Sequence, residues 1–151
     1  MDVEYALLAD SAQVVQGKLY MLGGGIDQIG AYNFPAVHPF LTLAMAIKVY
    51  PAECGREHKL EIEVWDQDGT RIGPHLEAKF STDRRKDDPM KHSLVQLVLN
   101  FAQPKFDRPG DYAFQILLNG EMRKTLPLTL VRLTVGQNQV GEQGETPNRS
   151  E

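Results

Sequence analysis

The chain has 151 residues, of which 42% are hydrophobic and 24% are charged, the composition of a soluble globular domain. Sixteen basic against twenty acidic residues give a net charge of −4, without the basic excess typical of proteins that bind nucleic acid or anionic membranes. Residues 1–5 lack a secretory signal pattern, and no stretch reaches the ~18 apolar residues of a membrane span. We therefore expect a cytoplasmic protein with neither nucleic-acid nor membrane partners.

Apolar residues alternate with polar ones along most of the chain, the pattern of half-buried β-strands. In chain order, the residues expected to share a face are Val3, Tyr5, Leu7 and Ala9; Leu19 and Met21; Leu60, Ile62 and Val64; Leu76, Ala78 and Phe80; Val95, Leu97, Leu99 and Phe101; and Leu126, Leu128 and Leu130, with Arg132 on the same side. Each run predicts one strand with one buried face.

The clearest predicted strand is residues 41–50, which lie between two prolines. Its odd-numbered positions are large and apolar, whereas Thr42, Ala44 and Ala46 leave the opposite face unusually small. Alanine, leucine and methionine also favour helices, but ten residues of unbroken alternation favour a strand. Something must lie close against the small face. A loop or the opposite sheet is the first candidate, and a second subunit is the alternative.

Residues 108–121 predict a turn, a strand and a hairpin. Pro109 and Gly110 form a turn pair, because proline presets φ and glycine accepts a positive φ. Asn119 and Gly120 are typical of a type I′ hairpin turn. A tyrosine just after such a corner, here Tyr112, is typical of the tyrosine corner of β-sandwiches, in which its hydroxyl bonds to upstream backbone.

Turn signals at residues 23–25, 68–69, 73–74 and 109–110 separate eight or nine expected strands, and no segment is convincingly helical. The leading architecture is therefore an all-β, two-sheet antiparallel sandwich of Ig-like or C2-like topology over residues 1–135. A closed barrel is the second choice. Residues 81–92 read as a solvated connection of mixed charge. Residues 136–151 hold one large apolar residue, Val140, and are expected to form a disordered tail.

No group of reactive residues stands out in the sequence. Residues 23–25 are three glycines, but an extended segment follows them rather than the helix of a phosphate loop, so we expect a turn. Cys54 is the only cysteine and has no recognisable catalytic partner. The histidines lack ligand spacing and are expected at the surface or rim: His38, His58, His75 and His92. We expect no enzyme, no catalytic residues, no cofactor and no metal site.

Asp66 and Asp68 keep one metal hypothesis open. Two carboxylates at a strand end can coordinate calcium, loosely as in calcium-dependent C2 domains. Such sites need acidic residues from a second loop, which Asp83, Asp87 and Asp88 would have to supply. The simpler interpretation of this segment is an ordinary Asp-Gly hairpin turn.

Two surfaces are candidates for contacts. If its strand stays regular, Trp65 lies on the side of Glu61 and Glu63 and exposes a large ring. Because it stands at a strand end, we favour a ring that curls over the core. The connection 31–40 holds three aromatic residues and two prolines. It predicts either a stiff contact loop or a crossover packed over one end of the domain, and we slightly favour the crossover.

Residues 9–25 (Ala-Asp-Ser-Ala-Gln-Val-Val-Gln-Gly-Lys-Leu-Tyr-Met-Leu-Gly-Gly-Gly), residues 108–114 and residues 126–128 together resemble an uncharacterised bacterial family, a domain of unknown function. The resemblance covers about residues 3–131. It implies a small soluble β-sandwich, and it carries no activity and no site residues.

The sequence therefore favours a non-enzymatic protein that acts through protein–protein contact, as an accessory subunit or by self-association. Two alternatives stay open. One is a calcium- or lipid-responsive C2-like module that uses Asp66 and Asp68, and the other is a sandwich that binds a small ligand or carbohydrate.

Overall fold

The computed structural model describes residues 1–136, and within this range the protein is all-β. The one helical element described is a three-residue 3-10 turn, η1 (Pro51–Glu53). Residues 1–136 contain twelve strands, more than the eight or nine expected, because several are too short to show a period. They are β1 (Asp2–Ala9), β2 (Ser11–Val15), β3 (Lys18–Leu22), β4 (Gln28–Ala31), β5 (Ala36–Val37), β6 (Phe40–Val49), β7 (His58–Asp66), β8 (Arg71–Phe80), β9 (Ser93–Ala102), β10 (Lys105–Phe106), β11 (Gly110–Leu118) and β12 (Glu121–Arg132). The tail expected over 136–151 lies, beyond Gly136, outside the described residues.

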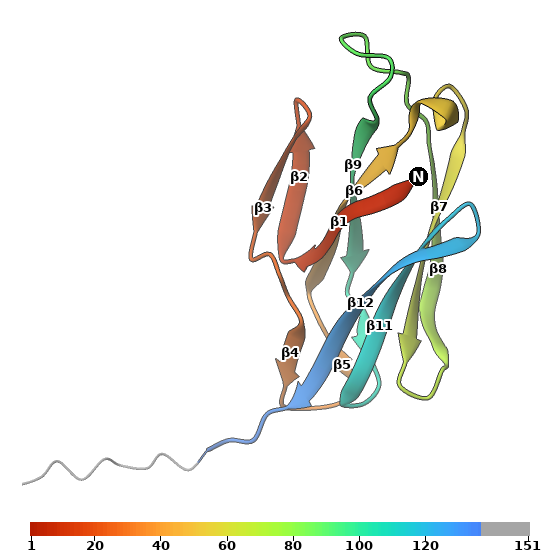
Figure 1. Cartoon of the computed structure of the whole chain (residues 1–151). Coiled ribbons are helices and arrows are strands. Elements are labelled where there is room, and N and C mark those ends of the chain that lie inside the picture. The colour runs from red at the N-terminus through yellow and green to blue at the C-terminus, as the bar shows by residue number, and fades with distance from the viewer. Residues whose placement is uncertain (137–151) are drawn as a thin grey trace, which may run out of the picture.

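The strands form four sheets rather than the two expected (Figure 1). A three-stranded sheet has the order β1-β6-β9, and a five-stranded sheet has the order β4-β12-β11-β7-β8. The hairpin β2-β3 and the short pair β5-β10 make up the other two. All pairings are antiparallel except that of β4 with β12, which is parallel because β4 arrives from a crossover and not from a hairpin.

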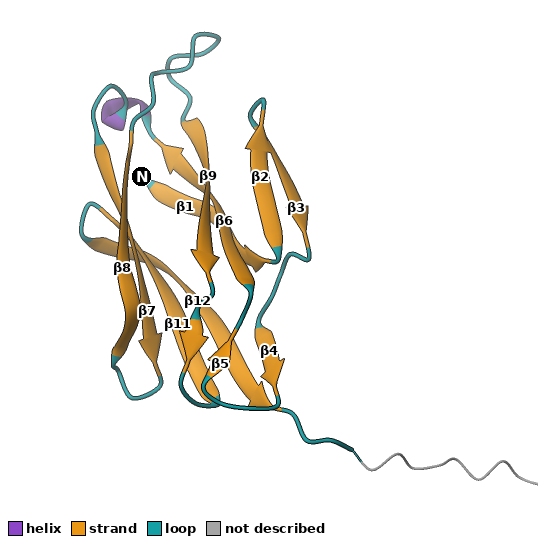
Figure 2. Cartoon of the chain, turned by 180° about the vertical axis from the view of Figure 1, so that it is seen from behind, coloured by secondary structure: helices purple, strands orange, loops and turns teal. Residues whose placement is uncertain are grey.

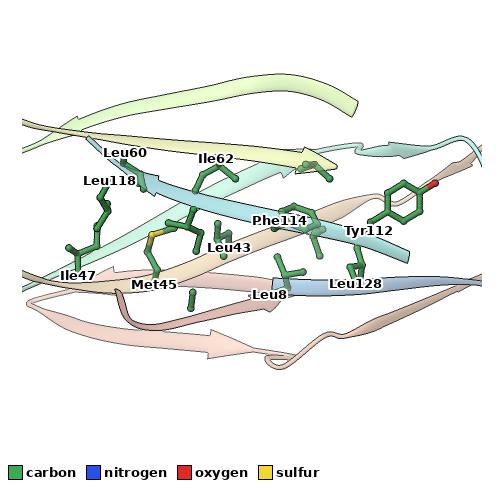
Figure 3. Packing of buried hydrophobic residues seen from close by; sticks show 14 of the residues in the cluster. Leu8, Leu43, Met45, Ile47, Leu60, Ile62, Tyr112, Phe114, Leu118 and Leu128 are labelled. Carbon is green, nitrogen blue, oxygen red and sulfur yellow. The ribbon is translucent and has the colours of Figure 1, made fainter. Parts of the chain in front are cut away.

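The two larger sheets share one hydrophobic core (Figure 3). Strand β6 contributes five large side chains with no exposed surface, and β7 and β11 contribute alternate residues from the other sheet. The predicted period of two is therefore confirmed for all three strands. Leu43 and Met45 of β6 lie close to Ile62 and Phe114 in the view of Figure 3.

The small face of β6 is covered by the same chain. Thr42, Ala44 and Ala46 are buried, and strand β2 contacts both β6 and β9. Figure 1 shows the hairpin β2-β3 standing beside these strands. Gln96 of β9 ties the hairpin down, because its Nε2 donates to the Gly17 carbonyl at 2.6 Å. The second subunit considered for this face is therefore not needed.

Candidate functional site

The two larger sheets end in the free edge strands β8 and β9 (Figure 2). Residues of both strands line one cavity, so an open seam lies between these edges. Strand β9 pairs only with β6, and β8 pairs only with β7, among the described residues. The inward-facing side chains of both strands pack on the core yet stay half-buried: Ile72, Leu76 and Ala78 from β8, and Val95, Leu97, Leu99 and Phe101 from β9. The core is thus covered least along this line, which we call the seam.

The edge of β9 lacks the features that normally keep sheet edges apart. Its ten residues include no charged residue and no proline. The other free edges of the two larger sheets are protected. Strand β8 contains Pro74, a register shift and several charged residues, β1 carries two acidic residues and a register shift, and β4 has four residues. A long, apolar, unpaired edge of this kind favours pairing with another strand.

The seam deepens at one end into a groove of about 610 Å³. Phe101 and Phe114 line it, with ring centroids 5.4 Å apart and planes at 84°. Ile72 and Leu76 of β8 and Phe106 of β10 also line the groove. This volume and an apolar lining are typical of sites that accept a ligand side chain or a small molecule.

Polar and charged residues also line the groove: Thr70, Arg71, Asn100, Gln103, Lys105 and Asp107. Asn100 accepts a hydrogen bond from the Thr42 hydroxyl at 3.0 Å, and Lys105 lies 3.6 Å from Asp107. The groove therefore offers both apolar and polar side chains beside a free backbone edge. Such an arrangement binds an extended chain through main-chain hydrogen bonds and inserted apolar side chains.

The structure brings Asp66 and Asp68 together, but an arginine side chain lies between their carboxylates and pairs with both. Arg108 pairs with both carboxylates, at 3.2 Å to Asp66 Oδ2 and closely to Asp68. The other oxygen of Asp66 accepts the backbone N–H groups of Thr70 (2.9 Å) and Asp68 (3.0 Å). These bonds, that of Thr70 first, hold the pKa of Asp66 below its usual range. The Asp66 carboxylate thus stabilises the β7–β8 turn through the N–H groups of Asp68 and Thr70.

The second loop of the calcium hypothesis lies at the opposite end of β8. Asp83, Asp87 and Asp88 follow that strand, whereas Asp66 and Asp68 precede it, and ten extended residues span about 33 Å. Asp87 pairs with its neighbour Arg85, which lowers the pKa of Asp87 to about 2. The structure does not bring the two acidic groups together.

One histidine joins a cluster that its spacing did not predict. On the outer face of β7 and β8, His75 Nε2 lies 3.2 Å from Glu61 and 4.0 Å from Glu77. These three side chains are close enough to hold a metal ion. However, the Lys59 ammonium lies 3.3 Å from Glu61 and 3.1 Å from Glu77, so both carboxylates already have a cation. The cluster reads as an ion-pair network on a solvated sheet face.

His58 is buried, and its expected place at the surface or rim is wrong. Its Nε2 lies 2.7 Å from the Glu53 carbonyl, and its Nδ1 lies 3.1 Å from Asn119 Nδ2. A neutral ring with Nε2 protonated satisfies both contacts. The alternation of β7 places His58 on the same face as Leu60, a signal that was present in the sequence. Cys54 lies nearby, half-buried, with Sγ 3.5 Å from the Tyr50 carbonyl.

The two predicted contact surfaces have mixed outcomes. Trp65 does not join the core, so the favoured curl over the core is wrong; the ring lies on the side of Glu63 and donates its indole N–H to that carboxylate at 3.0 Å. In the 31–40 connection, Phe34 packs against the core under the Arg132 guanidinium, as expected for a crossover. Tyr32 and Phe40 are exposed instead. The glycines at 23–25 form a turn that leads into strand β4, as expected.

Sequence reasoning identified the residues of β9 but not their place at an edge. Strand order depends on long-range pairing, which one sequence does not reveal. The lack of charge and proline over residues 95–101 did not reveal the edge either, because the equally long run 112–118, in the central strand β11, shares it.

No curated protein matches the chain. A solved structure, that of the alkylpurine DNA glycosylase AlkC of Pseudomonas fluorescens bound to DNA containing an abasic site analog, is similar with a TM-score of 0.47 and 9% identity. The match covers 83% of this chain and only 30% of that one. In the described residues, no helix has the length and apolar character needed to traverse a membrane.

Two expectations are corrected by this comparison. The expectations of no enzymatic activity and of no nucleic-acid partner are withdrawn; the similar structure is a DNA glycosylase bound to DNA. Net charge and the lack of a motif were too weak to support either exclusion. At this TM-score, however, the likeness carries no argument for either property in this chain.

The family comparison bears on the chain as a whole. A family described as "Family of unknown function (DUF6941)" matches residues 4–131, almost the range over which the sequence resembles a domain of unknown function. The match includes the seam, the tyrosine corner and every strand but the start of β1 and the end of β12. The chain therefore belongs to DUF6941, a family of unknown function.

Proposed function

We propose that the protein functions in protein–protein interaction by adding an extended polypeptide segment to the free edge of β9. In this proposal the three- and five-stranded sheets act as the two layers of a sandwich that is open along the seam. The added segment is a further strand of the β1-β6-β9 sheet. Its alternate side chains cover the half-buried residues of the seam.

One observation carries the proposal: β9 is a ten-residue edge strand without charge or proline, and its inward side chains stay half-exposed. Main-chain pairing would supply affinity along the edge, and inserted side chains would supply specificity. The groove beside Phe101 accepts a large apolar side chain, since its volume of about 610 Å³ falls within the range of ligand sites.

The outward face of β9 constrains the partner further. Leu94, Gln96, Val98, Asn100 and Ala102 alternate with the inward residues and carry no charge. A segment lying beside them therefore needs neutral outward side chains. The chemistry favours a strand with large apolar residues on one face and small neutral residues on the other.

Binding of a designed strand tests this function. The probe is a fluorescein-labelled ten-residue peptide in which leucine and valine alternate with threonine, with terminal lysines for solubility. We expect a rise in anisotropy with the full chain. A second peptide, N-methylated on the backbone of every residue between its terminal lysines, is expected not to bind, because neither of its edges keeps the donors needed for pairing.

Chain variants locate the site. Leu97→Lys places a charge in the seam and is expected to weaken peptide binding at least tenfold, whereas Met122→Lys, at an exposed position on β12, leaves it unchanged. Circular dichroism checks that both variants are folded. Phe101→Ala, which removes one ring from the groove lining, gives a second and milder test.

Two outcomes would overturn the proposal. One is equal binding of the normal and N-methylated peptides. The other is tight binding of labelled single-stranded or duplex DNA with no binding of the peptide, which would assign the chain to a different class of partner.

A further inference from the structure

We infer that the strand that occupies the β9 edge is β9 of a second copy of this chain, paired antiparallel about a two-fold axis. The inference rests on the proposed function, because it names the partner of the same edge. Among the described strands, β9 itself has the pattern that the edge requires: apolar residues inward and uncharged residues outward. An antiparallel pair of identical strands also brings no like charges together here.

The side-chain pattern selects the register. Directly opposed residues in an antiparallel pair share a face, so inward positions must meet inward positions. With Val98 on the axis, Leu97 lies opposite Leu99 of the second copy, and Val95 lies opposite Phe101. Moving the axis to Leu97 instead would place the Gln96 amide opposite the apolar Val98.

The Val98 register also pairs two amides. It sets Gln96 opposite Asn100 of the second copy on the outer face. Gln96 Oε1 accepts one bond, from the Tyr5 hydroxyl at 3.1 Å, which leaves a second lone pair. Asn100 uses only its Oδ1 among the described contacts, so its Nδ2 is available as the donor. In this register the Gln96 and Asn100 amides can hydrogen-bond to each other, whereas the register with Leu97 on the axis sets the Gln96 amide opposite the apolar Val98.

Pairing of this kind closes two seams at once. The β1-β6-β9 sheet would continue into its copy as six strands. The half-buried residues of β8 and β9 in each protomer would then face those of the other across the axis. Each apolar edge is covered by an equivalent edge, which gives a closed dimer rather than a filament.

Sedimentation equilibrium of the full chain is the first measurement. We expect a mass twice the 16.9 kDa of one chain, falling toward a single chain on dilution. Leu97→Lys is expected to shift the protein to monomer, and Met122→Lys is expected to leave the dimer intact. A dimer that survives Leu97→Lys in a folded protein would overturn the inference, since it would use another surface.

A disulfide tests the register without burying a charge. In a Cys54→Ser background, Val98→Cys places two thiols opposite each other across the axis, where paired Cα atoms lie within disulfide range. We expect rapid oxidation to a covalent dimer. Leu94→Cys is the matched control, because its copy would lie eight residues away along the strand, about 26 Å, and stays uncrosslinked.

The peptide experiment separates this inference from the function on which it rests. If the protein is a monomer, binds the designed peptide and forms no disulfide dimer through Val98→Cys, a second copy is ruled out as the partner. Strand addition to β9 is still supported in that case. A monomer that binds no peptide would rule out both strand addition to β9 and dimerisation through β9. A dimer that crosslinks through Val98→Cys and is displaced by the peptide supports both.

Discussion

The hydroxyl of Tyr112 donates a hydrogen bond of 2.7 Å to the backbone carbonyl of Arg108, four residues earlier. Between them, Gly110 takes a φ of +137°, a conformation that favours glycine. The Tyr112 ring is buried against Phe106 with centroids 5.0 Å apart, and burial raises the pKa of its phenol. The predicted tyrosine corner is therefore confirmed. It fixes the entry into β11, the central strand of the five-stranded sheet.

Tyr112→Phe removes this bond and keeps the ring. The Arg108 carbonyl then loses a partly buried partner, so we expect the free energy of unfolding to fall by about 1–2 kcal/mol. Urea unfolding followed by circular dichroism measures the change. Tyr20→Phe is the control, because that ring is exposed on β3. An equal loss in both variants would show that the corner bond contributes nothing.

Local signals in the sequence predicted much of this fold. Asn119 and Gly120 take φ of +51° and +81°, as the hairpin prediction requires. The alternation of residues 41–50 correctly predicted a strand, β6, over helix propensity, because its large residues fill the core. Each of these features depends on neighbours within a few residues.

Features set by distant pairing were not predictable. The four-sheet arrangement, the parallel pairing of β4 and the seam all depend on which strands become neighbours, and alternation does not specify this. Likewise, His75 reaches Glu61 only because β8 pairs with β7. No periodicity of a single strand encodes that contact.

Stability at low pH should depend on Asp66. Hydrogen bonds from Thr70 and Asp68, and the Arg108 guanidinium, hold the pKa of Asp66 below its usual range. A carboxylate with a lowered pKa in the folded state stabilises that state above the pKa of the unfolded chain, near 4 by the reference value. This contribution is lost as the pH falls through the folded pKa. We therefore expect the melting temperature to fall steadily below about pH 4.

Asp66→Asn tests this dependence, because it keeps one acceptor oxygen and removes the charge. We expect the variant to be less stable than the natural protein at pH 7 and to approach it at about pH 2–3, as the Asp66 carboxylate of the folded natural protein becomes protonated. Thermal unfolding across this pH range measures both curves. Asp27→Asn, at an exposed position without these contacts, should change neither. Parallel curves for Asp66→Asn and the natural protein would contradict the prediction.

The small face of β6 should not accept larger residues. Ala44 and Ala46 have no exposed surface beneath the β2-β3 hairpin. Ala44→Leu must displace the hairpin or strain β6, so we expect a loss of about 1–3 kcal/mol in the free energy of unfolding. We also expect faster hydrogen exchange in β2 and β3, measured by mass spectrometry. Ala52→Leu, on the exposed side of η1, is the control and should alter neither quantity.

Asn119 combines a backbone role with two side-chain contacts. Its φ of +51° suits the hairpin turn, its Oδ1 accepts the Lys59 N–H at 2.9 Å, and its Nδ2 lies 3.1 Å from Nδ1 of the buried His58. Asn119→Gly keeps the backbone conformation and loses both contacts. We expect it to lower the free energy of unfolding by about 1–3 kcal/mol, because the His58 nitrogen is left without a donor.

Asn119→Ala separates the two roles. It loses the same contacts and must also place a Cβ in the left-handed region, so it should be about 1 kcal/mol less stable than Asn119→Gly. Urea unfolding of both variants measures the difference. If Asn119→Gly matched the natural protein and Asn119→Ala alone were destabilised, the contacts with Lys59 and His58 would contribute nothing. In that case the turn, and not the buried histidine, would explain why asparagine stands at this position.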